Sequence, residues 1–161
     1  QALAYFDEKK LPVVIARLFN TVGPRQTGQY GMVLPSFVQS ALLGKPISVY
    51  GEGSQSRSFT HVNDVVGAIT KLMGEPLAEG DIFNVGNNKE VTINELALKV
   101  KEMTDSSSEI EHIPYEKAYG PGFEDMQRRC PSIKKINKLI GFKPSYDLEA
   151  MIQSVIDYFK A

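Results

Sequence analysis

The residues from Val13 to Leu18 form an apolar run interrupted by a single arginine, and this run constrains the fold more than any other feature. A nearly continuous apolar run is typical of a strand that is buried on both faces of a parallel sheet. A loop rich in Gly, Pro and Gln follows, from Thr21 to Gly31. In open α/β sheets, ligands bind where strands end and such loops begin. The run therefore predicts a parallel sheet with a ligand-binding edge near Asn20.

The rest of the chain alternates expected helices and short strands, which indicates an α/β fold in one compact unit. Thr92 and Glu95 have the Thr-x-x-Glu spacing of a capping box. Asn63 or Asp64 is expected to cap the helix that follows it, and the segment 114–122 is expected to be irregular. Helical spacing or end signals predict helices over 2–9, 32–43, 63–73, 93–103, 132–139 and 148–159, and strands are expected over 47–50, 58–62, 82–86 and 109–113.

Composition narrows the class of protein. With 161 residues, of which 42% are hydrophobic, the chain is long enough to bury a core. Its 18 basic and 19 acidic residues nearly cancel, so it has no broad positive field for nucleic acid or an anionic membrane. The lone cysteine, Cys130, excludes an internal disulfide and a Cys-based zinc site. No apolar run approaches the roughly 20 residues that span a bilayer. We expect a cytoplasmic location.

Two motifs carry candidate binding chemistry. Arg-Leu-Phe-Asn ends at Asn20, whose amide offers donors and an acceptor to a sugar hydroxyl or phosphate, or caps its own turn. The second motif, from Gly51 to Val62, is Gly-x-Gly-x-Gln-x-Arg-x-Phe-x-His-Val. Its Arg57 is permanently charged and forked, so it can bind two oxygens of a diphosphate. The alternative is a solvated arginine, which is the commoner situation for this residue type.

The segment between these motifs adds a third candidate surface. A helix is expected to begin near Met32, and the free amides of Val33 and Leu34 would favour an anion or the edge of a uracil. Ser48 and Tyr50 alternate onto one face of the next strand, where they would meet the edge and face of a base. The alternatives are an ordinary helix start and an ordinary half-buried strand.

Together these motifs resemble the nucleotide-sugar-binding, C-terminal half of the extended short-chain dehydrogenase/reductase family, the NAD-dependent epimerases, dehydratases and decarboxylases. A stretch from Phe123 to Pro144 resembles the C-terminal segment of that family, in which an acidic residue matching Asp125 meets the ribose hydroxyls. Many relatives carry a second arginine for the diphosphate where this chain has Gly122, and Arg129 is the substitute candidate for it.

The resemblance also implies roles for the remaining candidate residues. Asn20 would contact the substrate, Arg57 the diphosphate, and Leu18 the nicotinamide through its backbone. Val33, Leu34, Ser48 and Tyr50 would line the nucleotide pocket. His61 and Asp64 would support the helix that follows them. A UDP-sugar is the favoured ligand, although another nucleotide-sugar would fit the same motifs.

Family chemistry needs bound NAD, a Gly-rich turn and a catalytic Tyr-x-x-x-Lys pair. Tyr5 to Lys9 satisfies the spacing, but it lies too close to the strand that ends at Asn20. The pair, the turn and the half that binds NAD are therefore expected upstream of Gln1. The chain would then hold the end of the dinucleotide-binding sheet, about residues 1–31, and a nucleotide-sugar-binding domain, about 32–161.

Several expectations follow from this assignment. The isolated chain would show no turnover. Loss of the other half would expose the strand at Val13 to Leu18, so the chain alone would associate or would need the other half for full stability. The complete protein would be a homodimer. The C-terminal motif resembles UDP-glucuronate decarboxylases and UDP-glucose 4-epimerase-like proteins about equally. The alternative is a relative that has lost catalysis and only binds nucleotide or scaffolds a partner.

Overall fold

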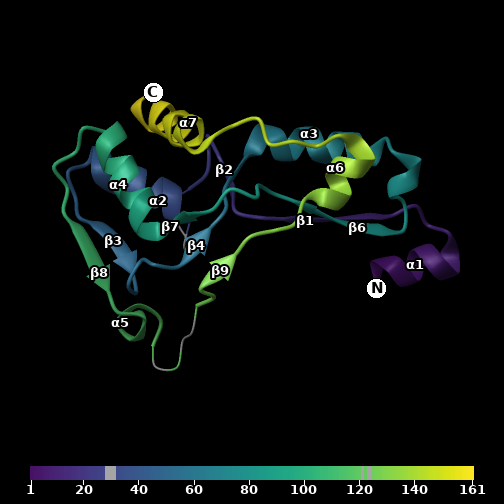
Figure 1. Cartoon of the computed structure of the whole chain (residues 1–161), viewed down its shortest axis with the longest axis horizontal. Coiled ribbons are helices and arrows are strands. Elements are labelled where there is room, and N and C mark those ends of the chain that lie inside the picture. Colours follow the sequence, from purple (N-terminus) through teal and green to yellow (C-terminus); the bar gives the residue numbers. More distant parts are fainter. Residues whose placement is uncertain (28–31, 121, 123–124) are drawn as a thin grey trace. The chain divides into compact units, whose positions relative to one another are not determined.

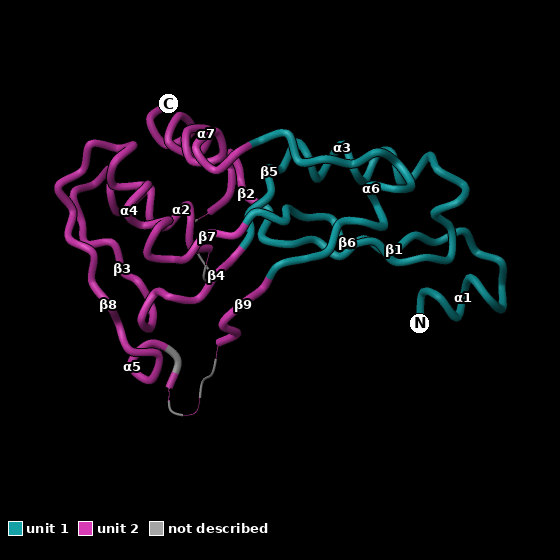
Figure 2. The backbone as a smooth tube through the Cα atoms, viewed as in Figure 1, with its two compact units in different colours: residues 1–21, 58–89, 130–146 teal, residues 22–57, 90–129, 147–161 magenta. Residues whose placement is uncertain are grey.

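The computed structural model describes residues 1–27, 32–120, 122 and 125–161, as drawn in Figure 1. These residues form two compact units, each assembled from separate stretches of the chain (Figure 2). Unit 1 contains residues 1–21, 58–89 and 130–146, and unit 2 contains residues 22–57, 90–129 and 147–161. The sequence contains no visible linker that indicates this division. Among the described helices, none has the length and apolar character needed to cross a membrane.

Unit 1 is built on a parallel pair of strands, β1 (Val14–Leu18) and β6 (Asp81–Val85). Helices α3 (Val62–Met73) and α6 (Lys134–Ile140) pack on this pair. Phe83 of β6 is 1% exposed and lies in a core of apolar side chains from both helices. Unit 1 also contains α1 (Ala2–Lys9) and the short 3₁₀ helix η1 (Pro76–Ala78). The core residues around Phe83 are Val65, Ala68, Leu72, Ala78, Val85, Ile136 and Phe142.

Strand β1 is parallel, as predicted, and within this chain it is not buried on both faces. Val14, Ile15 and Ala16 are half-buried, and Leu18 is 50% exposed. Within the described part of unit 1, β6 is the strand that pairs with β1. A strand in the middle of a parallel sheet has a neighbour on each side and helices on both faces. The expected association of the chain stays a prediction.

Unit 2 contains a parallel pair of strands covered by helices. Strand β3 (Ile47–Tyr50) pairs with β8 (Ile110–Ile113), with Ile47 opposite Ile110 and Tyr50 opposite Ile113. Helices α2 (Val33–Leu42) and α4 (Ile93–Met103) pack against β3, and α7 (Leu148–Lys160) packs on both helices. The core of this unit is formed by Val22, Leu34, Phe37, Val38, Ala41, Ile47, Val49, Ile93, Leu96, Ala97, Val100, Met151, Ile152, Val155 and Ile156.

A small second sheet in unit 2 holds the Arg57 motif. Its central strand, β4 (Ser56–Arg57), pairs antiparallel with β7 (Val91–Thr92) and parallel with β9 (Arg128–Arg129). Three segments far apart in sequence therefore meet at Arg57. The predicted capping box follows β7, where the amide of Glu95 donates to Thr92 Oγ1 at 3.1 Å and the amide of Thr92 donates to Glu95 Oε2 at 2.8 Å.

Short elements differ from the sequence-based expectation. The segment 114–122, expected to be irregular, contains the helix α5 (Tyr115–Tyr119). The strand expected over 58–62 is instead a shorter strand, β5 (Thr60–His61), and a further strand, β2 (Thr21–Val22), lies in the predicted loop. Elements this short carry too little hydrophobic periodicity to be recognised. Residues 28–31 of that loop lie outside the described residues.

His61 caps α3, a position predicted for Asn63 or Asp64. Its Nδ1 accepts a hydrogen bond from the backbone N–H of Asn63 at 3.2 Å, and its ring stacks on Tyr146 with centroids 3.8 Å apart. Asp64 instead accepts from the backbone N–H of Ser145 at 3.0 Å. His61 is 3% exposed. Both residues therefore support the helix, as expected. The capping bond is accepted by His61, however, and not by Asn63 or Asp64, which cap preferences alone would favour.

Lowering the pH from about 7.5 to about 5.5 is expected to destabilise the protein through His61. Burial lowers the pKa of His61, against a weaker opposing effect of the Asp64 charge. The unfolded state binds a proton near the ordinary pKa of about 6.5, and the folded state binds it only at lower pH. The stabilisation by the neutral ring is therefore complete above about pH 6.5 and is lost as the pH falls below it, by at most about 1.4 kcal/mol per pH unit.

Urea unfolding at the two pH values measures this effect in the wild type, in His61→Asn, and in His112→Asn as the matched histidine control. Asparagine at position 61 keeps a capping side chain without a titrating ring. His61→Asn should show a smaller loss of stability at low pH than the other two proteins. An equal loss in all three would contradict the prediction.

Candidate functional site

Arg57 is buried, with 7% of its surface exposed. Its Nη2 pairs with Asp125 Oδ2 at 2.6 Å, and its Nη1 donates to the carbonyl oxygens of Met126 at 2.8 Å and Ser56 at 2.7 Å. A buried guanidinium is stable only when its charge and its donors are paired in this way. The alternative of a solvated surface arginine is therefore excluded.

Asp125 is in direct contact with Arg57, another predicted binding residue of this unit. Its Oδ2 accepts from Arg57 and also from the hydroxyl of Tyr115, at 3.1 Å. No hydrogen bond to Oδ1 is formed by the residues that the structure describes. The carboxylate has a side-chain exposure of 30%, so it reaches solvent. The structure thus brings the predicted diphosphate residue and the predicted ribose residue into direct contact, while their roles stay predictions.

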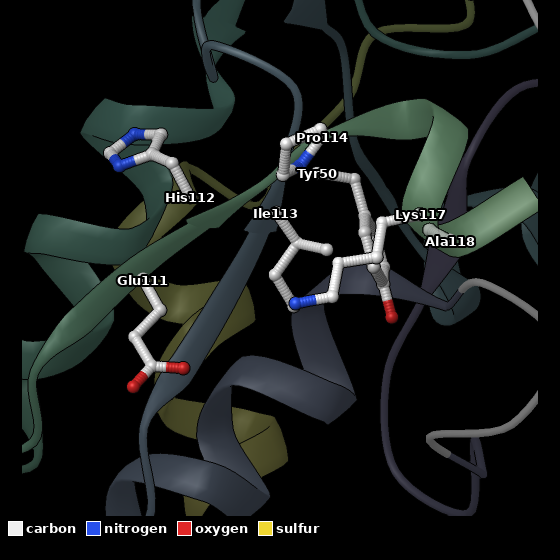
Figure 3. Close-up of a pocket in the computed structure, with 7 residues that line it drawn as sticks. All are labelled: Tyr50, Glu111, His112, Ile113, Pro114, Lys117 and Ala118. Carbon is white, nitrogen blue, oxygen red and sulfur yellow. The ribbon is translucent and has the colours of Figure 1, made fainter.

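The end of β3 opens onto a pocket of about 770 Å³. Ile47 and Val49 are buried on one face of β3, and Ser48 and Tyr50 lie on the other, as the alternation predicted. Tyr50 is 38% exposed and lines the pocket, whereas Ser48 is not among its lining residues. Figure 3 shows the residues around this pocket: Tyr50, Glu111, His112, Ile113, Pro114, Lys117 and Ala118. An exposed aromatic face suits a planar ring.

At the start of α2 the side chain of Leu34 is used in packing, which leaves its backbone N–H for a ligand. Leu34 is fully buried in the core and Val33 is half-buried. Pro35 has no N–H, and the N–H of Ser36 donates to the carbonyl of Met32 at 3.2 Å. Any contact from Leu34 would therefore be made by its backbone N–H, which is the contact that the sequence predicted.

Leu18 and Asn20 lie at the end of β1 in unit 1. Asn20 has a positive φ of 35°, a conformation that asparagine tolerates better than most residues. Its Nδ2 donates to the carbonyl of Ser58 at 2.7 Å, and its own carbonyl accepts from the N–H of Thr60 at 3.2 Å. The side-chain amide nitrogen of Asn20 therefore holds the segment at Ser58 beside the end of β1. The substrate contact of Asn20 and the cofactor contact of Leu18 stay predictions.

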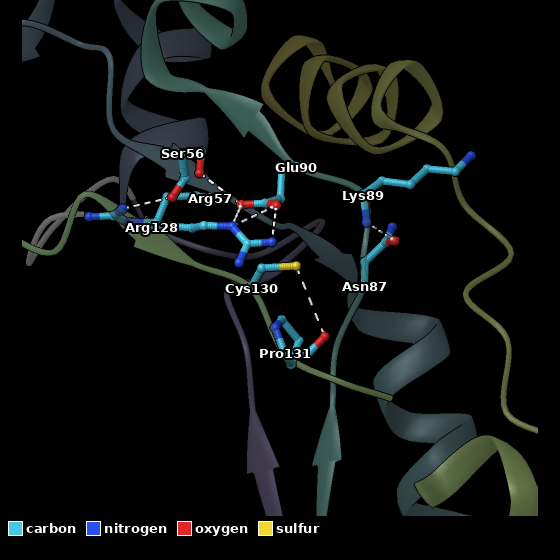
Figure 4. A network of polar contacts seen from close by, with 8 residues as sticks. All are labelled: Ser56, Arg57, Asn87, Lys89, Glu90, Arg128, Cys130 and Pro131. Atoms are coloured by element: carbon cyan, nitrogen blue, oxygen red, sulfur yellow. Dashed lines mark hydrogen bonds and ion pairs between the residues drawn. The ribbon is translucent and has the colours of Figure 1, made fainter. Parts of the chain in front are cut away.

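Glu90 and Arg128 form an ion pair that joins the strands around Arg57, as Figure 4 shows. Glu90 receives bonds from Arg128 Nε and Nη2, the shortest at 2.7 Å, and from Ser56 Oγ at 2.8 Å. These bonds, with Arg128 contributing most, lower the pKa of Glu90. Arg129 is exposed and lies opposite Arg57 in the strand register, so both project from the same face of the sheet. Arg129 remains the substitute candidate.

Sequence reasoning missed two residues of this site, Gln55 and Tyr115. Gln55 stands inside the Gly-x-Gly-x-Gln-x-Arg motif, two residues before Arg57, so its place in the motif was a signal that the sequence offered, whereas its burial is known only from the structure. Tyr115 gave no signal, because it reaches Asp125 only through the fold. Among the described residues, no cluster of His, Cys, Asp or Glu has the composition to hold a metal ion.

Comparison with known proteins identifies the family. A family model described as GDP-mannose 4,6 dehydratase matches residues 1–155. The chain belongs to this family. The matched relatives include nucleotide-sugar epimerases, dehydratases and decarboxylases of the extended short-chain dehydrogenase/reductase type. The predicted resemblance and the predicted α/β, Rossmann-type fold class are confirmed.

Curated relatives and solved structures agree with this family. A UDP-N-acetyl-alpha-D-glucosaminuronate decarboxylase of Bacillus cytotoxicus is 40% identical over 93% of the chain and 47% of the relative. UDP-glucuronic acid decarboxylase 1 of Danio rerio is 36% identical over 97% of the chain and 35% of the relative.

Two solved family members have the same fold. The Thermotoga maritima UDP-glucose 4-epimerase with UDP-glucose superposes with a TM-score of 0.87 at 27% identity, over 98% of the chain and 48% of its own. The dTDP-glucose 4,6-dehydratase of Bacillus anthracis, in complex with NAD, gives 0.86 at 26% identity, over 99% of the chain and 48% of its own. NAD is thus used in the family, and the chain spans about half or less of each of these proteins.

Proposed function

We propose that the chain is the nucleotide-sugar-binding portion of an NAD-dependent enzyme that decarboxylates a UDP-uronate. The observation that carries this proposal is the buried Arg57, paired with Asp125, in the same unit as the pocket beside Tyr50. One unit thus offers a cation for a diphosphate, a carboxylate for ribose hydroxyls and an aromatic face for a base. These three groups match the diphosphate, the ribose and the base of a nucleoside diphosphate.

Each residue has a defined task in this proposal. Arg57 binds the diphosphate oxygens through the N–H groups that its bonds to Ser56, Met126 and Asp125 leave unused, and Asp125 accepts a ribose hydroxyl at Oδ1 while Oδ2 keeps its bond to Arg57. Tyr50 places its ring against the uracil, and the N–H groups of Val33 and Leu34 meet the nucleotide at the start of α2. Ser48 stands on the face of β3 that carries Tyr50.

Leu18 is proposed to contact the nicotinamide, and Asn20 is proposed to contact the sugar. Leu18 follows the apolar part of β1 and is half exposed, so its backbone and side chain can border a nicotinamide ring. Asn20 follows it and turns its amide toward Ser58. Bound NAD supplies a hydride acceptor that oxidises the sugar transiently. The residues of this chain hold the substrate in place.

Decarboxylation is favoured over epimerisation by the order of similarity. The curated relatives at 40% and 36% identity carry the names of uronate decarboxylases, and the solved epimerase and dehydratase are 27% and 26% identical. The family membership is common to all of these reactions. The choice among them needs an assay in which the products differ.

The complete protein that carries this chain should release CO₂ when it is incubated with UDP-glucuronate and NAD. Chromatography of the nucleotide product distinguishes a UDP-pentose from UDP-galacturonate. The epimer without CO₂ would show that the decarboxylase assignment is wrong. UDP binding without any turnover would identify a non-catalytic relative, and absence of UDP binding would refute the proposed site. The 161-residue chain alone should bind UDP without turnover, and turnover by it would make Tyr5 and Lys9 the catalytic pair.

A further inference from the structure

Gln55 is a buried amide that connects the base end of the site to the Arg57–Asp125 pair. It is 6% exposed, and its Nε2 donates to the carbonyl of Tyr50 at 3.0 Å and to the hydroxyl of Tyr115 at 2.9 Å. A primary amide has two N–H groups, so both donors of Gln55 are used. One of them holds the end of β3, and the other reaches Tyr115 of α5.

The direction of the next hydrogen bond is set by chemistry. An ionised carboxylate only accepts hydrogen bonds, so the hydroxyl of Tyr115 donates to Asp125 Oδ2 and accepts from Gln55. Donors therefore run in one direction, from Gln55 through Tyr115 to Asp125, where they meet the Arg57 donor. Hydrogen bonds arranged in such a chain polarise and strengthen one another.

The ring of Tyr115 is fixed by close packing on the turn after β3. A Cβ atom at Gly51 would lie 2.4 Å from Tyr115 Cε2, so the ring rests directly on the glycine backbone. Gly51 also has a φ of +69°, which other residues rarely adopt. The N–H of Gly51 donates to the carbonyl of Ile113 at 2.8 Å, which ties this turn to the end of β8 just before α5. The hydroxyl of Tyr115 therefore has little freedom.

We propose that Tyr115 is a positioning residue for nucleotide recognition, with Gln55 as its support. By holding Oδ2 of Asp125 together with Arg57, Tyr115 sets the rotation of the carboxylate and leaves Oδ1 for the ribose. This inference rests on the proposed function, since it assumes a ribose at Asp125. Tyr115 itself does not touch the nucleotide in this arrangement. Its effect is therefore specific to the part of the nucleotide that Asp125 contacts.

Tyr115→Phe tests the inference, because it removes the hydroxyl and keeps the ring on Gly51. Calorimetric titration of the complete protein with UDP and with 2′,3′-dideoxy-UDP separates ribose recognition from the rest of binding. The affinity for UDP should fall about 5- to 10-fold, the size of the net contribution of one ordinary hydrogen bond, because Tyr115 acts on the ribose only through Asp125. The affinity for the dideoxy analogue should stay nearly constant, so the preference for UDP shrinks. Gln55→Met should change the preference in the same direction.

Tyr158→Phe serves as the matched control, since Tyr158 is an exposed tyrosine on α7 of the same unit. A purely structural role of Tyr115 would weaken both nucleotides equally and leave their ratio unchanged, and that result would overturn the inference. Unchanged affinities in Tyr115→Phe would overturn it too. Failure of the wild type to bind UDP would refute the proposed function and this inference with it, so the two failures are distinguishable.

Discussion

Arg57→Ala in the complete protein is expected to weaken UDP binding roughly 30-fold to several hundredfold. The substitution removes a charge-assisted, forked contact to the diphosphate, worth about 2 to 4 kcal/mol where the surroundings are desolvated. The low exposure of Arg57 supports the upper part of this range. Arg57→Lys should recover only part of the loss, because an ammonium keeps the charge without the fork. NAD occupancy should hardly change.

Calorimetric titration of UDP into the wild type and the two variants measures this effect. Lys45→Ala is a suitable control, because Lys45 is an exposed cation of the same unit. Melting curves of each variant establish that the fold is intact, since Arg57→Ala also leaves Asp125 without its counter-ion. Equal UDP affinities in wild type and Arg57→Ala would show that Arg57 serves the fold alone.

Phe83→Ala is expected to lower the free energy of unfolding by about 3 to 5 kcal/mol. Phe83 is 1% exposed in β6 and is surrounded by side chains of α3 and α6, so its removal leaves a cavity that these helices cannot fill. The melting temperature should drop by roughly 6 to 20 °C for a domain of this size. Val66→Ala, at a position of α3 that is 55% exposed, should change it little. Similar melting of the two variants would contradict the assigned core.

The long helices and the Arg57 motif could be predicted because their signals are local. Helices over 93–103 and 148–160 have a full hydrophobic period and end signals, and Thr92 with Glu95 makes a capping box at any helix start. The family motif around Arg57 depends on residue types at fixed spacing. The burial of Arg57 could not be predicted in this way, because it depends on Asp125 and Met126, which lie far along the chain.

What could not be predicted depends on partners that periodicity does not show. The apolar run in β1 indicates what a strand is suited to, while its exposure depends on which neighbours are present. His61 caps α3 because Tyr146 stacks on its ring, and cap preferences contain no such information. The contact of Tyr115 with Asp125 likewise arises only when α5 and the chain before β9 come together.

The chain passes between its two units after residues 21, 57, 89, 129 and 146. Any single cut between these outermost crossings leaves pieces of both units on both fragments. Limited proteolysis should therefore nick the molecule without releasing either unit, and truncation from one end cannot yield unit 2 by itself. Glu90, Arg128 and Ser56 lie within two residues of three of these crossings and bind one another. A mutational map of the proposed nucleotide site must for this reason use point substitutions, because deletions would disrupt both units at once.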